Sequence, residues 1–374
     1  MNKQDRQSAR RISEIARNFN ITGNVASVTH MVSGHINSSY RITCESGHFR
    51  TAQQYLLQRL NRKVFPDPES VMENICRICS HLKQKINQRG FTDTQRRVLT
   101  PVPLAENKYL YTDENSEYWR MYLYIADTET SLSVRSPEDA FTAGYAFARF
   151  HADLSDLPGP ALQEIIPSFH DTPLRLLELE AAVADDICNR AAASEDIINY
   201  LLSFREKSGL LVEALNSRTI PRRVVHNDAK MSNILLDVQT GEALCIVDLD
   251  TVMPGTVLYD FGDMVRSMTT TAAEDETDAD NITLQPELFE ALAHGYLRGS
   301  ASFLTAEERN NLLDAGEIII LEQAVRFLTD YLRGDTYYHT AYPEHNLVRC
   351  KSQAALLRSL ITQKQKLEHI LKNI

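Results

Sequence analysis

The sequence has no excess of basic residues and no long apolar run. Lys and Arg number 39 against 50 Asp and Glu in 374 residues, a formal net charge of −11 at pH 7. This balance excludes a general basic footprint for nucleic acid or anionic lipid. No run approaches the roughly 18 apolar residues of a membrane-spanning helix, and no apolar stretch follows the polar start at 1–11, as it would in a signal peptide. We therefore expect a cytoplasmic protein without a nucleic-acid or membrane partner.

Cysteine, glycine and proline are also too scarce for several classes of protein. The six cysteines are scattered, which is typical of a reduced protein and not of a disulfide scaffold. Cys76 and Cys79 form a C-x-x-C, but no second C-x-x-C or nearby histidine pair completes a zinc site. Their positions follow the apolar spacing of a helix, so we predict that they pack within it. With 43% hydrophobic residues, the chain can bury a sizeable core in two or three domains or one two-lobed unit.

The first 125 residues have the pattern of a small sheet with helices around it. Residues 5–19 have the apolar spacing of a helix. Prolines in the first turn indicate the start of a second helix, at 69–88. Between and after these helices, apolar residues alternate as they do in half-buried strands. Strands are predicted at 25–33, 39–44, 55–60 and 118–125.

Beyond about residue 130 the apolar spacing is mainly helical. One strand region interrupts it at 233–250, and the acidic segment 271–281 predicts an exposed, mobile loop. We therefore predict an α+β fold with a sheet lobe at 1–124 and a helical lobe at 125–374. Helices are expected at 141–154, 174–187, 196–215, 288–297, 315–332 and 347–374.

The strongest chemical signal lies in residues 224–250. The segment reads V-V-H-N-D-A-K-M-S-N-I-L-L-D and, after a turn, L-C-I-V-D-L-D. His-x-Asp-x-Lys-x-x-Asn is the spacing of a phosphoryl-transfer catalytic loop. In this pattern Asp228 accepts the proton of a hydroxyl, and Lys230 neutralises charge on the phosphoryl group. Asn233 offers a neutral oxygen to Mg²⁺. Each residue alone has a plain structural interpretation, so the conjunction carries the prediction.

Asp248 is predicted to be the second metal ligand. If Thr240 and Gly241 form a hairpin turn, Asn233 falls opposite Asp248. Directly opposed residues have Cβ atoms about 4.5–5.5 Å apart, and two oxygen ligands of one Mg²⁺ need a reach of that order.

Two further residues are assigned supporting roles. Asp260-Phe261-Gly262 spells the D-F-G of protein kinases, but it follows Asp248 and is not reached by the hairpin. We therefore expect Asp260 to hold the catalytic loop by hydrogen bonds. His226 is expected to pack within the loop or brace it.

More motifs extend this pattern over most of the chain. They are G-H-I-N at 34–37, V-F-P-D at 64–67, V-D-L-D-T-V-M-P-G at 247–255, Y-D-F-G-D at 259–263, R-F-L-T-D-Y-L at 326–332 and G-D-T-Y at 334–337. With them, the chain resembles the aminoglycoside phosphotransferase and choline kinase superfamily, and most strongly its N-acetylhexosamine 1-kinases. The resemblance implies a protein-kinase-like, two-lobed fold. It also implies transfer of the ATP γ-phosphate, with Mg²⁺, to the anomeric hydroxyl of N-acetylglucosamine or N-acetylgalactosamine.

The resemblance also implies where the sugar and the metal bind. Asp228 would be the base, and the Mg²⁺ ligands would again be Asn233 and Asp248. The sugar contacts would be His35, Arg326 and Tyr337. Plain alternatives remain for these three, as a turn residue, a helix-surface cation and a half-buried ring.

The nucleotide site departs from the protein-kinase pattern. Kinases place a phosphate-binding lysine on the third strand, whereas here the only cation of that strand is Arg59, which could instead be solvated. Its helix partner would be Glu73. Since the loop at Gly34 has a single glycine, Ser38 and Ser39 would share in holding the phosphates. A linker at Tyr124-Ile125 is expected to contact adenine through its backbone.

Two alternatives stay open. The same chemistry could act on an aminoglycoside, choline, homoserine or a plain hexose. A cationic substrate needs a carboxylate-rich pocket, and the predicted contacts are not acidic, although the 271–281 loop is. The other alternative is a nucleotide-sensing scaffold, which the presence of the whole catalytic set disfavours. The sequence does not specify the oligomeric state.

Overall fold

The computed structural model describes residues 3–31, 37–45 and 52–374. The chain divides into two compact units, each described by itself. The predicted division of function at residues 124 and 125 stays a prediction. The sheet unit comprises Met1–Thr128, Asp237–Thr240 and Leu244–Thr251, and the helical unit comprises Glu129–Leu236, Gly241–Ala243 and Val252–Ile374.

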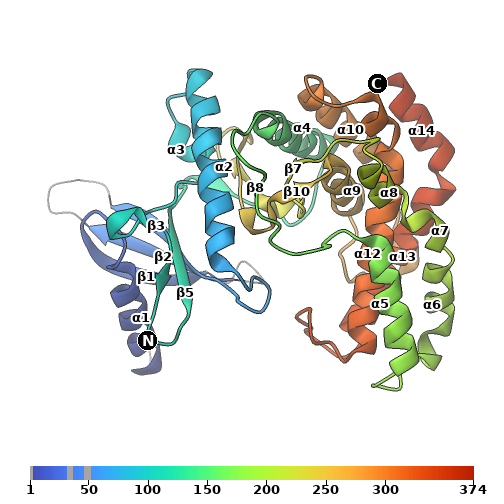
Figure 1. The fold of residues 1–374 in the computed structure, drawn as a ribbon, viewed down its shortest axis with the longest axis horizontal. Helices are drawn as coiled ribbons and strands as arrows, with labels where there is room; N and C mark the ends of the chain where they lie inside the picture. The colour runs from blue at the N-terminus through green and yellow to red at the C-terminus, as the bar shows by residue number, and fades with distance from the viewer. Residues whose placement is uncertain (1–2, 32–36, 46–51) are drawn as a thin grey trace. The chain divides into compact units, whose positions relative to one another are not determined.

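The sheet unit is built on a five-stranded antiparallel sheet in the order β1-β2-β3-β5-β4 (Figure 1). The alternation that predicted its four long strands reflects one face turned to a core, where Ile42 and Leu57 are fully buried. Helix α1 (Lys3–Ala16) adds Ile12 and Ile15 to that core. The strands are β1 (Asn24–Met31), β2 (Ser38–Glu45), β3 (Gln53–Arg59), β4 (Tyr111–Thr112) and β5 (Tyr118–Leu123).

Helix α2 (Pro68–Gln88) begins as its sequence predicts. The Asp67 side chain accepts a hydrogen bond from the Ser70 N–H, at 3.1 Å, and the proline lies in the first turn. Cys76 and Cys79 lie on this helix as free thiols, and burial raises the pKa of Cys76 to about 11. The predicted packing role of the C-x-x-C is therefore confirmed.

The helical unit is organised around α12 (Leu312–Leu332), which packs against α5, α9 and α13 (Figure 1). The approach of α9 to α12 is close at Gly262, where an added Cβ would lie 2.5 Å from the Ala315 carbonyl oxygen. The glycine of the D-F-G triplet thus serves packing. The long helices are α4 (Pro137–Leu154), α5 (Thr172–Asp185), α9 (Val257–Met268), α10 (Pro286–Ser300), α12 and α13 (His345–Thr362).

Two helix predictions need correction, and one long helix was missed. The helix predicted at 196–215 is three short helices, and the one predicted at 347–374 breaks at Gln363 into α13 and α14 (Lys364–Asn373). Apolar spacing reports which face is buried, and it continues across breaks that keep that face inward. Helix α9 was not predicted, and it is buried almost all round. The three short helices are α6 (Glu195–Leu202), α7 (Arg205–Ser208) and α8 (Leu210–Asn216).

Short strands flank the catalytic loop. Strand β7 (Arg223–Val225) precedes it and pairs antiparallel with β10 (Met253–Gly255). The predicted strands after the loop are present as β8 (Ile234–Asp237) and β9 (Ala243–Ile246). Gly241 in their connection has a φ of +72°, a conformation that suits glycine in a tight turn. A short strand β6 (Thr128–Glu129) follows the linker that is predicted to contact adenine.

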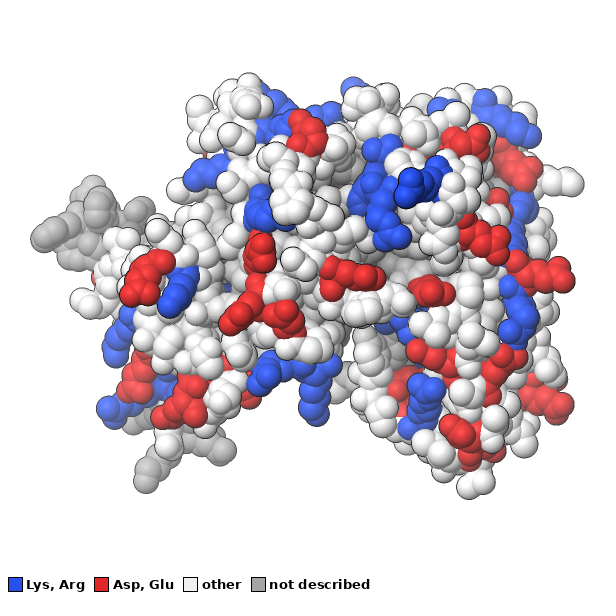
Figure 2. Space-filling view, in the orientation of Figure 1, with Lys and Arg blue, Asp and Glu red and all other residues white. Residues whose placement is uncertain are grey.

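The distribution of surface charge and the apolar content of the helices agree with the composition. On the face shown in Figure 2, basic side chains are interspersed with acidic ones. Of the helices that the structure describes, none is both long and apolar enough to cross a membrane.

Candidate active site

The catalytic loop, residues 226–233, brings three predicted residues together. The Lys230 Nζ lies 2.8 Å from Oδ2 of Asp228. The Asn233 amide donates to the same oxygen at 3.0 Å and to the Asp228 carbonyl at 2.8 Å. A tight turn, closed by the Asn233 N–H on the Lys230 carbonyl at 3.0 Å, produces this convergence. The predicted spacing therefore corresponds to a real cluster.

The electrostatics of the loop keep Asp228 ionised. Burial alone would raise the pKa of Asp228, but Lys230, His226 and the Asn233 amide together hold it below the ordinary value. The side chain remains 28% exposed. A carboxylate that is charged at neutral pH and still accessible can accept the proton of a hydroxyl group.

Asp260 holds the loop from helix α9, as predicted. Its carboxylate accepts hydrogen bonds from the His226 N–H at 2.7 Å and the Asn227 N–H at 2.6 Å. The His151 ring contacts the same carboxylate at 2.6 Å, and its other nitrogen lies 3.2 Å from the Tyr296 hydroxyl. Burial would raise the pKa of Asp260, but His151 and the loop keep it lowered. The aspartate of the D-F-G triplet thus fixes the loop backbone.

His226 has the packing role that the sequence predicted. Its side chain is buried, and its ring lies edge-on to Phe147 and Phe150 at centroid distances of 5.5 and 6.0 Å. Asn227, which follows it, has a φ of +64°, a left-handed conformation that asparagine tolerates. Together these two residues fix the backbone that leads into Asp228.

The predicted metal ligands are suited to a hard cation. The nitrogen of the Asn233 amide is used in bracing Asp228, which leaves its side-chain oxygen as the possible ligand. Asp248 is exposed, with a φ of +59°, and lies two residues after the end of β9. Carboxylate and amide oxygens fit Mg²⁺, which keeps several waters and needs few protein ligands. Asn233 and Asp248 belong to different units, so their sharing of one ion stays a prediction.

The predicted nucleotide residues of the sheet unit lie on β2, β3 and the linker after β5. Arg59 donates to the Ser38 hydroxyl at 3.2 Å, and its nearest carboxylate is Glu117 at 3.6 Å. Glu73, its predicted partner, is exposed on α2. Ser39 accepts a hydrogen bond from Gln58 at 3.0 Å.

Two backbone groups of the linker form hydrogen bonds with other residues of the sheet unit. The Tyr124 N–H donates to the Gln54 carbonyl at 3.0 Å. The Ile125 carbonyl accepts from the Thr128 hydroxyl at 2.9 Å. The predicted adenine contact at this linker would therefore use the Tyr124 carbonyl and the Ile125 N–H, and it stays a prediction.

The sequence analysis missed a buried ion pair in the sheet unit. Arg120 on β5 pairs through both terminal nitrogens with Asp250, the second aspartate of V-D-L-D, and one of the two contacts is 3.0 Å. The Asn37 amide donates to the same carboxylate at 2.7 Å, and Gln58 accepts from Arg120 at 2.9 Å. The available signal was a cation inside the apolar strand Y-W-R-M-Y-L.

Two of the three predicted sugar contacts come together in the helical unit. The guanidinium of Arg326 on α12 lies 5.0 Å from the ring centre of Phe169, 5.8 Å from Tyr337 and 5.7 Å from Tyr338. These are cation–π distances. The Tyr337 side chain is 56% exposed, so a ligand can reach it. His35, the third predicted contact, lies outside the described residues.

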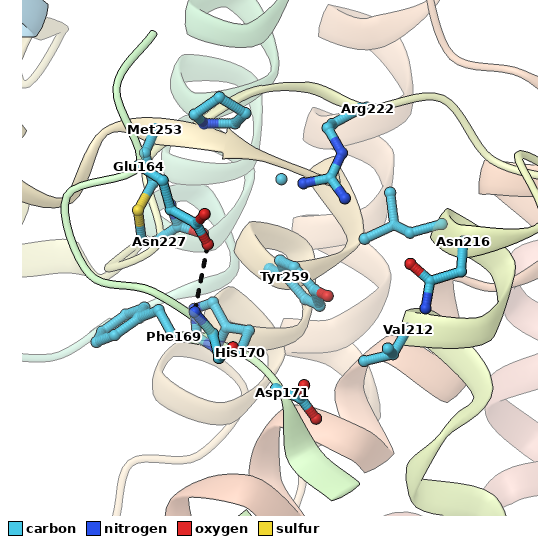
Figure 3. Close-up of a pocket in the computed structure, with 14 residues that line it drawn as sticks. Glu164, Phe169, His170, Asp171, Val212, Asn216, Arg222, Asn227, Met253 and Tyr259 are labelled. Carbon is cyan, nitrogen blue, oxygen red and sulfur yellow. Dashed lines mark hydrogen bonds between the residues drawn. The ribbon is translucent and has the colours of Figure 1, made fainter. Parts of the chain in front are cut away.

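A small cavity of about 230 Å³ lies beside these groups in the helical unit. Asn227 of the catalytic loop and Phe169 both line it, with Tyr259 of α9. Figure 3 shows Arg222 and Glu164 on opposite sides of it. The cavity therefore adjoins both the catalytic loop and the aromatic ring next to Arg326. Sequence reasoning did not find its residues, because they come from separate loops.

The acidic 271–281 segment is tied to cations of its own unit. Glu274 lies 3.3 Å from Arg266 and 3.5 Å from Arg349. Asp275 lies 3.3 Å from His345 and accepts a hydrogen bond from the Tyr342 hydroxyl at 3.2 Å. Glu274 is therefore paired with two arginines, and Asp275 with a histidine ring and a hydroxyl donor.

Comparisons with known proteins bear on the family and the fold. The model of the phosphotransferase enzyme family matches residues 32–307, most of the chain. A microcompartment-associated aminopropanol kinase has a similar structure, with a TM-score of 0.64 and 17% identity over 96% of this chain and 98% of that one. A spectinomycin phosphotransferase, APH(9)-Ia, solved with ADP and spectinomycin, has a TM-score of 0.61 and 11% identity over 96% and 98%. For choline kinase from Cryptosporidium parvum Iowa II the values are 0.53 and 12%, over 95% and 97%. The predicted fold class, an N-terminal antiparallel sheet followed by a helical part, is confirmed.

Proposed function

The chain belongs to the phosphotransferase enzyme family, and from that premise we propose that it is an ATP-dependent kinase of an N-acetylhexosamine. The phosphate would go to the anomeric C1 hydroxyl of N-acetylglucosamine or N-acetylgalactosamine. The observation that carries the proposal is the cluster of an ionised Asp228, Lys230 and Asn233 in the catalytic loop. Residues of these kinds are used in phosphoryl transfer to a hydroxyl group.

In the proposed reaction, Asp228 accepts the C1 hydroxyl proton while the C1 oxygen bonds to the γ-phosphorus. The bond from that phosphorus to the ADP oxygen breaks in the same displacement. An anomeric hydroxyl is more acidic than an ordinary alcohol because the ring oxygen withdraws electron density, so a carboxylate is an adequate base. Lys230 is placed to neutralise charge on the phosphoryl oxygens. Mg²⁺, when bound by Asn233 and Asp248, would shield the negative charge of the phosphates.

The proposed nucleotide contacts lie in the sheet unit. Arg59 and the serines Ser38 and Ser39 would meet the phosphates, and Tyr124 and Ile125 would meet adenine. The side chain of Arg59 is 42% exposed, and its contact with Glu117 is long, at 3.6 Å. A surface ion pair of this kind is weak, so Arg59 can exchange it for a phosphate.

The predicted sugar contacts favour a neutral acceptor. The guanidinium of Arg326, beside Tyr337, can donate to a carbonyl or hydroxyl oxygen of a sugar. Two similar solved structures, an aminopropanol kinase and a choline kinase, are named after amine-bearing molecules. Glu274 and Asp275, which could have recruited a cation, are already paired. His35 completes the proposed sugar contacts.

The proposal is tested by coupled ADP release over a panel of free sugars, aminoglycosides, choline, ethanolamine and homoserine. We expect release that depends on added N-acetylglucosamine or N-acetylgalactosamine, with little for the amine-bearing compounds. ADP release that depends on choline or an aminoglycoside would support kinase activity but contradict the proposed acceptor. Absence of acceptor-dependent release with the whole panel would remove the proposed acceptor class entirely.

A further inference from the structure

Three charged residues follow one another along a single face of helix α12. Glu322, Arg326 and Asp330 are spaced four residues apart, so their side chains lie one above the next. Both acids are buried, with exposures of 1% for Glu322 and 5% for Asp330. A buried carboxylate is stable only where it accepts hydrogen bonds or pairs with a cation. The partners of these two acids come from two different loops.

Glu322 fixes the loop on one side of Arg326. Its carboxylate accepts from the Thr172 hydroxyl at 2.7 Å and lies 2.7 Å from Nδ1 of His170. From the other side, Arg175 donates to the Ser168 carbonyl at 2.7 Å. Phe169 lies between these anchors, and its ring meets that of His170 at 4.7 Å, edge to face (Figure 3). The anchored loop therefore holds the Phe169 ring near the guanidinium.

Asp330 fixes the loop on the other side. Its two oxygens accept the backbone N–H groups of residues 336, 337 and 338 at 2.9, 2.8 and 3.0 Å. The amide of Asn346, which is fully buried, donates to Asp330 and to Asp335, each at 2.9 Å. Four donors on one carboxylate leave the segment 336–338 little freedom. The Tyr337 ring is thereby held against Tyr338, at 4.8 Å, and beside Arg326.

We propose that Glu322 and Asp330 are positioning residues for the acceptor, because they set Phe169 and Tyr337 as two walls around the guanidinium of Arg326. The inference rests on the proposed function, in which Arg326 and Tyr337 meet the sugar. Aromatic faces pack against the C–H groups of a sugar ring, and the guanidinium donates to a carbonyl such as that of an acetamido group. The pair therefore determines specificity for a carbonyl-bearing ring.

The test compares isosteric variants with a matched control on the same helix. Glu322→Gln and Asp330→Asn keep the volume but turn an NH₂ group toward donors. Glu317→Gln is the control, because Glu317 is also buried on α12 but pairs with Lys207 and Lys364. All three should lower the melting temperature. Only the first two should raise the acceptor KM, by about tenfold, with kcat and the ATP KM within about twofold.

The specificity readout is the ratio of kcat/KM for N-acetylglucosamine to that for glucose. It should fall by about tenfold in Glu322→Gln and Asp330→Asn and stay constant in Glu317→Gln. Unchanged acceptor KM and unchanged ratio in both variants would overturn the inference. An equal rise of the acceptor KM in the control would also overturn it, because the effect would then be general destabilisation.

Failure of the proposed function is separated from failure of this inference by amide hydrogen exchange without substrate. Faster exchange at residues 336–338 in Asp330→Asn, and not in Glu317→Gln, would support the anchoring even if no sugar in the panel is phosphorylated. Equal exchange in Asp330→Asn and the unchanged protein would overturn it.

Discussion

The two units each hold an important arginine, and its surroundings differ. In the sheet unit, Arg120 is 2% exposed and is paired through two nitrogens with Asp250. In the helical unit, Arg326 is half-buried among three aromatic rings, and among the described residues it has no ion pair with a carboxylate. A guanidinium saturated by a carboxylate serves structure, whereas one held by rings keeps donors for a ligand. We therefore propose that Arg120 serves stability and that Arg326 serves recognition.

The largest expected effect separates chemistry from nucleotide binding. Asp228→Asn removes the proposed base, so kcat should fall by about 10²–10⁴-fold. The proposed ATP contacts in the sheet unit are unchanged, so thermal stabilisation by Mg-ATP should persist. Steady-state kinetics and thermal shift measure the two effects. Near-normal turnover would remove Asp228 from the role of base.

Arg120→Met tests the structural half of the comparison. Asp250 would be left as a buried charge without its cation, so the free energy of unfolding should fall by about 3–5 kcal/mol. Denaturant unfolding measures this, and Arg120→Met combined with Asp250→Leu is the control, since it should recover part of the loss. A loss of less than about 1 kcal/mol in the single variant would mean that the pair is not structural.

Arg326→Met tests the recognition half. The acceptor KM should rise by about 10- to 100-fold, because the donor to the sugar is lost from a half-buried site. The free energy of unfolding should fall by about 1–2 kcal/mol, because three cation–π contacts and the attraction to the buried Glu322 carboxylate are lost. Kinetics on N-acetylglucosamine and denaturant unfolding give both numbers. A variant that is destabilised as much as Arg120→Met, with an unchanged acceptor KM, would erase the distinction between the two arginines.

The smallest effect is a shift of the acid limb of the pH profile. Because the folded pKa of Asp228 is lowered, the base stays ionised as pH falls through the ordinary carboxyl range. Activity is lost only when pH falls through that lowered pKa. Lys230→Met removes a cation that lowers the pKa, so the limb should move to higher pH. The position of the limb in kcat/KM, and not the rate, is the measurement, and an unmoved limb would contradict the coupling of the two side chains.

The sequence predicts the local parts of this molecule well and the non-local parts poorly. Asp228, Lys230 and Asn233 lie within one loop, so their spacing alone indicates the cluster. Arg120 and Asp250 are separated by 130 positions, and the sequence around neither residue indicates that the two form an ion pair.

The face of α12 shows both cases at once. The four-residue spacing of Glu322, Arg326 and Asp330 is visible in the sequence. The partners of Glu322, however, lie about 150 positions earlier, at His170 and Thr172. Only the fold reveals that these acids hold loops in place. It also shows which side chains surround Arg326 and Tyr337, the two contacts predicted from resemblance.

The most direct test of the central claim is NMR of the product formed from ATP and N-acetylglucosamine. The account predicts a phosphorus signal coupled to the proton on C1 of the sugar, and none with the Asp228→Asn variant. Phosphate on another carbon, or the same product formed at an equal rate by that variant, would contradict it.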